Sequence, residues 1–356
     1  MEYPQLVWYC SALSTEITDT PLARMICEKP IVFYRGKSGK VVALEDRCAH
    51  RQAPLSLGRV QGDDIECSYH GFVFDCSGAC VYVPRQDTVP KSARIASYPV
   101  VERWGYIWLW LDDPAKADPN CVPHLPWTED KALRAVYFRF DVNANFQLMA
   151  DNLMDVSHTE FLHRTSIGSQ TGRRGQDEET KVDLDCRVEG DRVHFVRRVH
   201  NTLLGPVATK WAGSSKPVTR SNTLMWEAPN TIHSVLEFQN EETHNTVHME
   251  HIMTPRTATS TFYFMNWVRD FGTDNVGYPT DEDVRREQTA VVCGEDIPMV
   301  EAQQRNIDLF GMVQDVPARQ DRFITAVHHT LRQIYAKADK PVPAELQRLA
   351  VLRQAG

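Results

Sequence analysis

The pattern of apolar positions divides the chain into two parts. In the first part the apolar residues form short β-branched or aromatic runs separated by glycines, with no helical period. Residues 31–45 have the pattern of a hairpin, in which IVFYR and KVVALE flank the turn Gly-Lys-Ser-Gly. These runs predict a small all-β domain. Further short strands are predicted over 63–70, 72–75, 79–84 and 100–111.

The second part mixes strands with helices. It begins after a stretch dense in proline, aspartate and asparagine between Asp112 and Pro123, which has the composition of a linker. We therefore expect a boundary near residue 118, with domains over 1–118 and 119–356, and an α+β fold class. Strands are predicted over 135–142, 191–199, 221–228, 232–239, 246–253 and 260–268, and helices over 144–163, 281–309 and 321–337.

Composition and charge exclude several classes of protein. Hydrophobic residues make up 42% and charged residues 24% of the chain, and the net charge of −8 comes without a basic block, which argues against nucleic-acid binding. No apolar run approaches the ~20 residues that span a bilayer, and the N-terminus lacks the basic start and apolar core of a signal peptide. We expect a cytoplasmic protein with no membrane partner, whose nine cysteines include metal ligands and do not form a disulfide framework.

Two cysteine–histidine pairs lie in the all-β part. Cys48 and His50 form a C-x-H pair, and after a gap of sixteen residues Cys67 and His70 form a C-x-x-H pair. Two cysteines and two histidines can hold a structural zinc ion. They can also hold a [2Fe–2S] cluster in which two histidines replace two cysteines on one iron, the Rieske arrangement. Zinc sites usually pair like with like, so one mixed pair per loop favours the Rieske cluster, with zinc as the alternative.

A second group of candidate ligands lies at 150–164, ADNLMDVSHTEFLHR, within the first predicted helix. On a regular helix His158 and His163 lie about 140° apart, too far for one metal unless the helix ends or bulges between them. We therefore expect both histidines to bind a metal together with a carboxylate from elsewhere, and Asp155 to orient one imidazole. Two histidines and one carboxylate form the facial triad of non-haem Fe(II) oxygenases. Two histidines satisfied in a helical core are the alternative.

The chain as a whole resembles the Rieske non-haem iron oxygenases, in the group that contains vanillate O-demethylase, dicamba O-demethylase and toluenesulfonate methyl-monooxygenase. The resemblance covers nearly the whole chain. It implies an N-terminal Rieske [2Fe–2S] domain followed by a helix-grip catalytic domain, a curved antiparallel sheet wrapped around a helix. The matching motifs are CAHR, PLSLG, CSYHGFVFD, VFYRG, YPVVERWGYIWLW, DNLMDVSHTEFLH, HIMTPRTATSTFYF and GEDIPMVEAQQ.

The resemblance also implies roles for individual residues. Asp296 matches the third iron ligand, with its neighbour Glu295 as the alternative. Asp155 matches the aspartate that bridges a Rieske histidine of one subunit to an iron histidine of the next, and Asn152 supports that bridge. His251 falls in the region where relatives contact an anionic aromatic substrate; a histidine satisfied within its strand is the alternative.

The implied activity is that of a terminal oxygenase component. Electrons from NAD(P)H arrive through an external flavin- or ferredoxin-type reductase, because the chain has neither a flavin nor a nicotinamide fingerprint. The implied cofactors are a [2Fe–2S] Rieske cluster and mononuclear Fe(II). A head-to-tail homotrimer is implied, in which the cluster of one subunit serves the iron of the next. The expected reaction is hydroxylation of an aromatic acid or aryl methyl ether by O2, with oxidative O-demethylation favoured.

Three alternatives remain at this point. Hydroxylation of an aryl methyl group or of an aromatic ring would use the same cofactors. A Rieske electron carrier would need only the first 118 residues, so the second group of ligands argues against it. A zinc-stabilised binding module would lack the visible absorption of a Rieske cluster.

Overall fold

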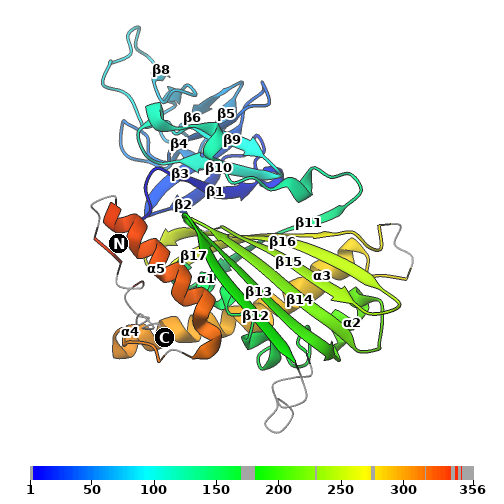
Figure 1. Cartoon of the computed structure of the whole chain (residues 1–356). Coiled ribbons are helices and arrows are strands. Elements are labelled where there is room, and N and C mark those ends of the chain that lie inside the picture. The colour runs from blue at the N-terminus through cyan, green and yellow to red at the C-terminus, as the bar shows by residue number, and fades with distance from the viewer. Residues whose placement is uncertain are drawn as a thin grey trace. The chain divides into compact units, whose positions relative to one another are not determined.

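The chain forms two structural units (Figure 1). The computed structural model describes residues 3–169, 181–228, 231–273, 277–316, 318–337, 341–343 and Leu346. One unit comprises Tyr3–His124 with Thr254–Ala258, and the other comprises the described residues of 125–253 and 259–356. Among the described residues, no helix is long and apolar enough to cross a membrane.

The N-terminal unit is built from three small antiparallel sheets, and its described helical residues form only short 3₁₀ turns. The predicted hairpin over 31–45 is confirmed as β3 and β4, whereas the first two strands have no sequence pattern that predicted them. The sheets, in strand order, are β1 (Trp8–Leu13), β10 (Tyr106–Trp110) and β9 (Val100–Arg103); β2 (Leu22–Ile26), β3 (Lys29–Arg35) and β4 (Val41–Glu45); and β5 (Arg59–Gln61), β6 (Asp64–Glu66), β7 (Val73–Phe74) and β8 (Cys80–Tyr82).

The second unit contains one seven-stranded sheet in which the described strand pairs run antiparallel. The six predicted strands are confirmed. The seventh, β12, lies at the sheet edge and is mostly exposed, so its sequence lacks the alternation that reveals a half-buried strand. In spatial order the strands are β11 (Arg134–Val142), β17 (Ser260–Arg269), β16 (His244–Thr257), β15 (Thr231–Gln239), β14 (Val218–Glu227), β13 (Arg192–Thr202) and β12 (Val182–Glu189).

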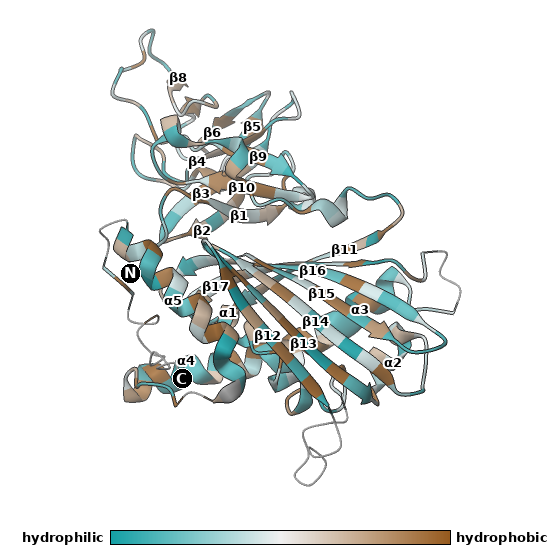
Figure 2. Ribbon diagram, in the orientation of Figure 1, coloured by the Kyte–Doolittle hydropathy of each residue, from teal (hydrophilic) through white to brown (hydrophobic). Residues whose placement is uncertain are grey.

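Helices pack against this sheet, as expected for a helix-grip domain. The first helix contacts β17, the third contacts β11, and the last packs on β12 and β13 (Figure 1). Along the strands, apolar and polar residues alternate (Figure 2), and so do buried and more exposed positions. The helices are α1 (Phe146–Met154), α2 (Pro206–Ala212), α3 (Asp281–Val291), α4 (Ile297–Phe310) and α5 (Arg322–Lys337).

The helix predicted over 144–163 is too long, because α1 ends at Met154. At its end Asp155 leaves the helical conformation with φ −86° and ψ 79°. The Asp155 carboxylate accepts hydrogen bonds from the backbone N–H of Ser157 at 3.0 Å and from the Ser157 hydroxyl at 2.5 Å. Such a side-chain turn competes with continued helix. The apolar period continues beyond this point, so it could not reveal the break.

Trp267 on β17 lies at the centre of the hydrophobic core of this unit. Its side chain is fully buried, and its ring lies edge-on to the rings of Trp211 and Phe271, at centroid distances of 5.4 Å and 6.0 Å. Edge-on aromatic contacts add to the free energy that comes from burying apolar area. Through these ring contacts the sheet packs against the segments that follow β13 and β17.

We expect Trp267→Ala to lower the free energy of unfolding of this unit by about 3–5 kcal/mol, because the substitution leaves a large cavity among rings that cannot collapse into it. Denaturant unfolding followed by circular dichroism measures the change. Val188→Ala is the matched control: Val188 is 52% exposed on the edge strand β12, and its loss should change stability by no more than about 0.5 kcal/mol. Equal effects of the two substitutions would contradict this view of the core.

Candidate metal centres

The two cysteine–histidine loops of the N-terminal unit share one backbone pattern. The N–H of Cys48 donates to the carbonyl five residues ahead, at Ala53, and its own carbonyl accepts from Gln52 at 2.9 Å. The N–H of Cys67 likewise donates to the carbonyl five residues ahead, and its carbonyl accepts from Gly71 at 2.9 Å. Gln52 and Gly71 both have positive φ, 59° and 73°. Two loops of unequal spacing thus form equivalent cradles, a likeness that the spacing alone did not reveal.

The four side chains of these loops divide into a buried pair and an exposed pair. Cys48 and Cys67 are 2% and 1% exposed, whereas His50 and His70 reach the surface, with ring centroids 4.6 Å apart. Burial, and after it the neighbouring Cys67 thiol, raise the pKa of Cys48 to about 11, so a metal is needed to hold the Cys48 sulfur as a thiolate.

The spread of these four donors argues against a single zinc ion. Tetrahedral zinc would draw its sulfur and nitrogen donors to within roughly 4 Å of one another. In the described part of the chain, only one group of three or more donors lies within 4.8 Å, and it is in the other unit. Two sulfurs inside and two imidazoles outside suit a cluster with two separate iron atoms.

His158 and His163 come together because α1 has ended before either of them. His158 lies in a 3₁₀ turn, His158–Glu160, and its Nδ1 contacts the backbone carbonyl of Asp155. The Nδ1 of His163 lies 2.5 Å from a carboxylate oxygen of Glu295. Because both contacts are made to oxygen atoms, the Nδ1 side of each ring is held in place and the Nε2 atoms of the two rings face each other.

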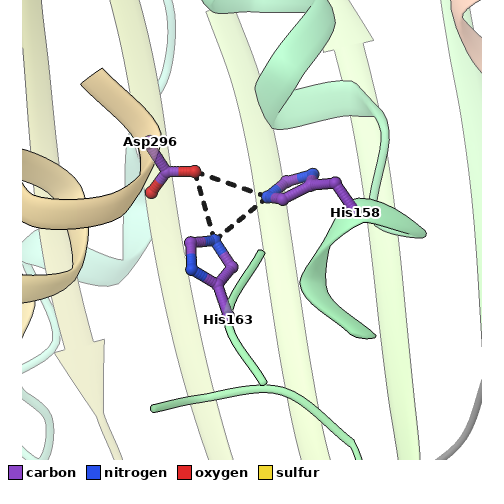
Figure 3. A group of neighbouring side chains, drawn as sticks. All are labelled: His158, His163 and Asp296. Atoms are coloured by element: carbon purple, nitrogen blue, oxygen red, sulfur yellow. Dashed lines mark hydrogen bonds and ion pairs between the residues drawn. The ribbon is translucent and has the colours of Figure 1, made fainter. Parts of the chain in front are cut away.

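Both Nε2 atoms meet the carboxylate of Asp296 (Figure 3). The Asp296 Oδ1 lies 3.1 Å from the His163 Nε2 and 3.4 Å from the His158 Nε2, and the two Nε2 atoms lie 3.1 Å apart. Burial alone would raise the pKa of Asp296, but the two histidines hold it at about 2, so the group is a carboxylate at neutral pH. Oδ1 is buried between the two rings. Two ring nitrogens and one carboxylate oxygen that converge in this way fit a metal cation.

A π-turn directs the two consecutive acids to opposite sides of one imidazole. The predicted helix over 281–309 is confirmed as α3 and α4, with a π-helical turn at Val292–Asp296 between them. Pro298, early in α4, has no N–H to donate to the carbonyl four residues before it, and an inserted π-turn is a usual response to such a break. Asp296 therefore faces Nε2 of His163, while Glu295 faces Nδ1 and also accepts from the Ser166 hydroxyl at 2.7 Å.

Asp155 and Asn152 lie together on the outer side of this site. They line a hollow of about 780 Å³ that also reaches His158. The main-chain carbonyl of Asp155 orients His158, whereas its carboxylate binds Ser157. The sequence predicted that Asp155 orients an imidazole but not which of its two groups does so. The Oδ1 of Asn152 is buried and has no hydrogen-bond partner among the described residues.

A smaller cavity of about 100 Å³ lies on the inner side of the three donors, bounded by inward side chains of β14 to β17. His251 lines it, is 7% exposed, and has its Nδ1 2.7 Å from the Tyr263 hydroxyl. Burial lowers the pKa of His251 to about 4, so its ring is neutral at pH 7. Arg220 lines the same cavity and was missed from sequence, because a single arginine in an alternating strand carries no local signal.

Comparison with known protein families supports both centres. Residues 7–99 match the Rieske [2Fe-2S] domain family, and residues 142–337 match the family described as the Vanillate O-demethylase oxygenase C-terminal domain. The first match contains the two cysteine–histidine loops, and the second contains both histidines and the aspartate that converge in Figure 3.

Individual relatives agree with these matches. The chain is 34% identical to the vanillate O-demethylase oxygenase subunit of a Pseudomonas species, over 86% of this chain and 87% of the relative. It is 33% identical to the oxygenase component of dicamba O-demethylase from Stenotrophomonas maltophilia, over 86% and 89%. The crystal structure of dicamba monooxygenase bound to dicamba superposes with a TM-score of 0.85 at 29% identity, covering 95% of this chain and 99% of that one.

We expect Asp296→Asn to abolish tight iron binding in the second unit, because it removes the charge that balances a cation. Glu295→Gln should weaken iron binding about 10–100-fold without abolishing it, because it loosens only the hydrogen bond that orients His163. Iron titration of the apoprotein measures both effects, with the visible absorption of the cluster as an internal control. Glu282→Gln, on the exposed first turn of α3, should bind iron normally. Iron loss on Glu295→Gln but not on Asp296→Asn would reverse the two roles.

Proposed function

The chain belongs to the Rieske non-haem iron oxygenases of the vanillate O-demethylase type, and from this membership we propose that it oxidatively removes an O-methyl group from an aromatic substrate. It is the terminal oxygenase of a multi-component system, with a [2Fe–2S] Rieske cluster and a mononuclear iron as cofactors and a reductase as partner. The observation that carries the proposal is the convergence of two Nε2 atoms and one carboxylate beside a mostly apolar cavity.

The proposed reaction balances without further reactants. An aryl methyl ether, O2, two electrons and two protons give a hemiacetal and water, and the hemiacetal then collapses to a phenol and formaldehyde. NAD(P)H supplies the electrons through an external flavin- or ferredoxin-type reductase. Within the protein, the iron supplies oxygen activation and the cluster supplies electrons one at a time.

The residues have the following proposed roles. His158, His163 and Asp296 hold the iron, and Glu295 and the Asp155 carbonyl fix the two imidazole rings so that Nε2 faces the metal. The apolar cavity wall excludes water and orients the aromatic ring. The ligands of the cluster are Cys48, His50, Cys67 and His70.

We assign electron entry to the outer hollow, with Asp155 and Asn152 at its base, and propose a head-to-tail homotrimer in which the cluster of a second copy docks there. Two features support the docking. The hollow is bordered by exposed apolar residues, since Val316 is 91% and Met299 is 49% exposed and both line it. On the N-terminal unit, the cluster histidines lie at the surface beside Tyr69, which is 66% exposed. We infer from this exposed apolar border that the hollow is covered in the assembly.

We also propose that the two domains meet near residue 118, with the cluster domain over 1–118 and the iron domain over 119–356. The two family matches bracket this position, since one ends at residue 99 and the other begins at residue 142. The three short 3₁₀ turns between Pro114 and Thr128, each beginning with a proline, suit a connecting segment.

We expect Asp155→Asn to keep both metals and to lower turnover about 10–100-fold. Asparagine retains a side-chain oxygen that accepts hydrogen bonds from Ser157, so the end of α1 is preserved. The contact between His158 and the backbone carbonyl of residue 155 is preserved as well, and only the negative charge is lost. The decisive measurement is the rate at which a chemically reduced cluster is reoxidised by O2 in the presence of substrate. Asp191→Asn, a surface control, should behave as wild type. Normal NADH-coupled turnover by Asp155→Asn would remove Asp155 from the electron path.

We expect the purified protein, with a generic reductase and NADH, to release formaldehyde from one or more methoxybenzoates, one molecule for each phenol formed. Removal of the mononuclear iron by a chelator should abolish product while the red-brown cluster absorption remains, and Fe(II) should restore activity where Zn(II) does not. Alcohols from methylbenzenes without formaldehyde would instead favour aryl methyl hydroxylation, and a ring-hydroxylated product would favour attack on the ring.

A further inference from the structure

Arg220 carries a positive charge inside the cavity of the iron site. It lies on β14, where Arg220, Asn222 and Leu224 alternate onto the inward face and line the cavity. Its side chain is only 2% exposed. Burial lowers the pKa of Arg220 to about 10, so the guanidinium remains protonated at neutral pH. A buried charge is costly unless a partner balances it.

The described residues leave this charge without an ion-pair partner. The Nη1 of Arg220 donates to the backbone carbonyl of Ile167 at 2.7 Å, and its Nε has no hydrogen-bond partner. The acid whose charge acts on it, Glu160, is already paired with Arg197, and both side chains of that pair are 8% exposed. Two arginines and one glutamate thus leave one net positive charge in this cluster.

Apart from the metal centre, the other polar groups of the cavity cannot supply a positive charge to an anionic ligand. His251 is neutral at pH 7 because it is buried, and it already shares a hydrogen bond with Tyr263. Asn222 and Ser234 can offer hydrogen bonds but no charge. The remaining wall is mostly apolar and includes Trp211, Leu236, Met249 and Met265.

We propose that Arg220 binds an anionic group of the substrate and thereby restricts the cavity to aromatic carboxylates or sulfonates. This inference rests on the proposed function of the site and assigns the residue that determines its specificity. The guanidinium fork matches the planar geometry of a carboxylate. A ligand anchored by its acid group at Arg220 would lay its ring against the apolar wall and direct the opposite substituent toward His158, His163 and Asp296.

The test compares charged and neutral ligands of the same shape. The iron- and cluster-loaded full-length protein is titrated calorimetrically with 4-methoxybenzoate, 4-methoxybenzenesulfonate and 4-methoxybenzamide, and product formation is measured with each. We expect the two anions to bind at least tenfold more tightly than the amide. Arg220→Gln should weaken binding of the anions about 30-fold or more and leave amide binding within about threefold of wild type, because only the anions lose a charge-assisted contact.

Two further variants keep the result interpretable. Arg220→Lys retains the charge and should recover part of the anion affinity, which separates charge recognition from a purely structural role. Arg198→Gln is the matched control. Arg198 is an exposed arginine on the neighbouring strand, and it is bonded to the Ser221 hydroxyl at 3.2 Å on the opposite face of the sheet. Its loss should change the binding of neither the anions nor the amide.

The outcomes also separate this inference from the proposed function. Two results would overturn the role of Arg220 but not the proposed oxygenase activity. One is turnover of the amide with no preference for the anions, and the other is an equal loss of binding affinity for all three ligands in Arg220→Gln. Failure of both anions to bind the wild-type protein would overturn it as well. Absence of mononuclear iron from the protein would instead overturn the proposed function itself.

Discussion

The convergence of two ring nitrogens and one carboxylate oxygen is the constraint on which the second unit depends. The two Nε2 atoms lie 3.1 Å apart, and the Asp296 Oδ1 lies 3.4 Å from one and 3.1 Å from the other. The rings are not free to turn away, because the Nδ1 atom of each ring is held by an oxygen, the Asp155 carbonyl in one case and Glu295 in the other. The early end of α1 and the π-turn before α4 are both needed to bring these groups together.

The residue types and their order were enough to identify much of this site. The two histidines are five residues apart, so regular helix geometry already required a break between α1 and the second histidine. The position of the break was beyond sequence reasoning, since it depends on the competition between the Asp155 side chain and the next helical hydrogen bond. The third ligand lies over a hundred residues away, and only the resemblance to a family connected it to the histidines.

Other parts of the molecule left no readable pattern in the sequence. The edge strand β12 is exposed on most positions and so lacks alternation. Arg220 resembles any charged residue in a strand until the register of the sheet shows that it points inward. The shared backbone pattern of the two cysteine loops is likewise invisible, because one loop places its histidine two residues after cysteine and the other three.

The π-turn has a consequence for how this protein can change over time. Glu295 and Asp296 hold the two nitrogens of one imidazole, although neighbouring residues of a regular helix point about 100° apart. Loss or gain of a single residue between Val291 and Ile297 would rotate both acids away from His163 at once. Substitutions that keep the number of residues in this turn leave both acids directed at His163. Length, and not only residue identity, therefore determines this site.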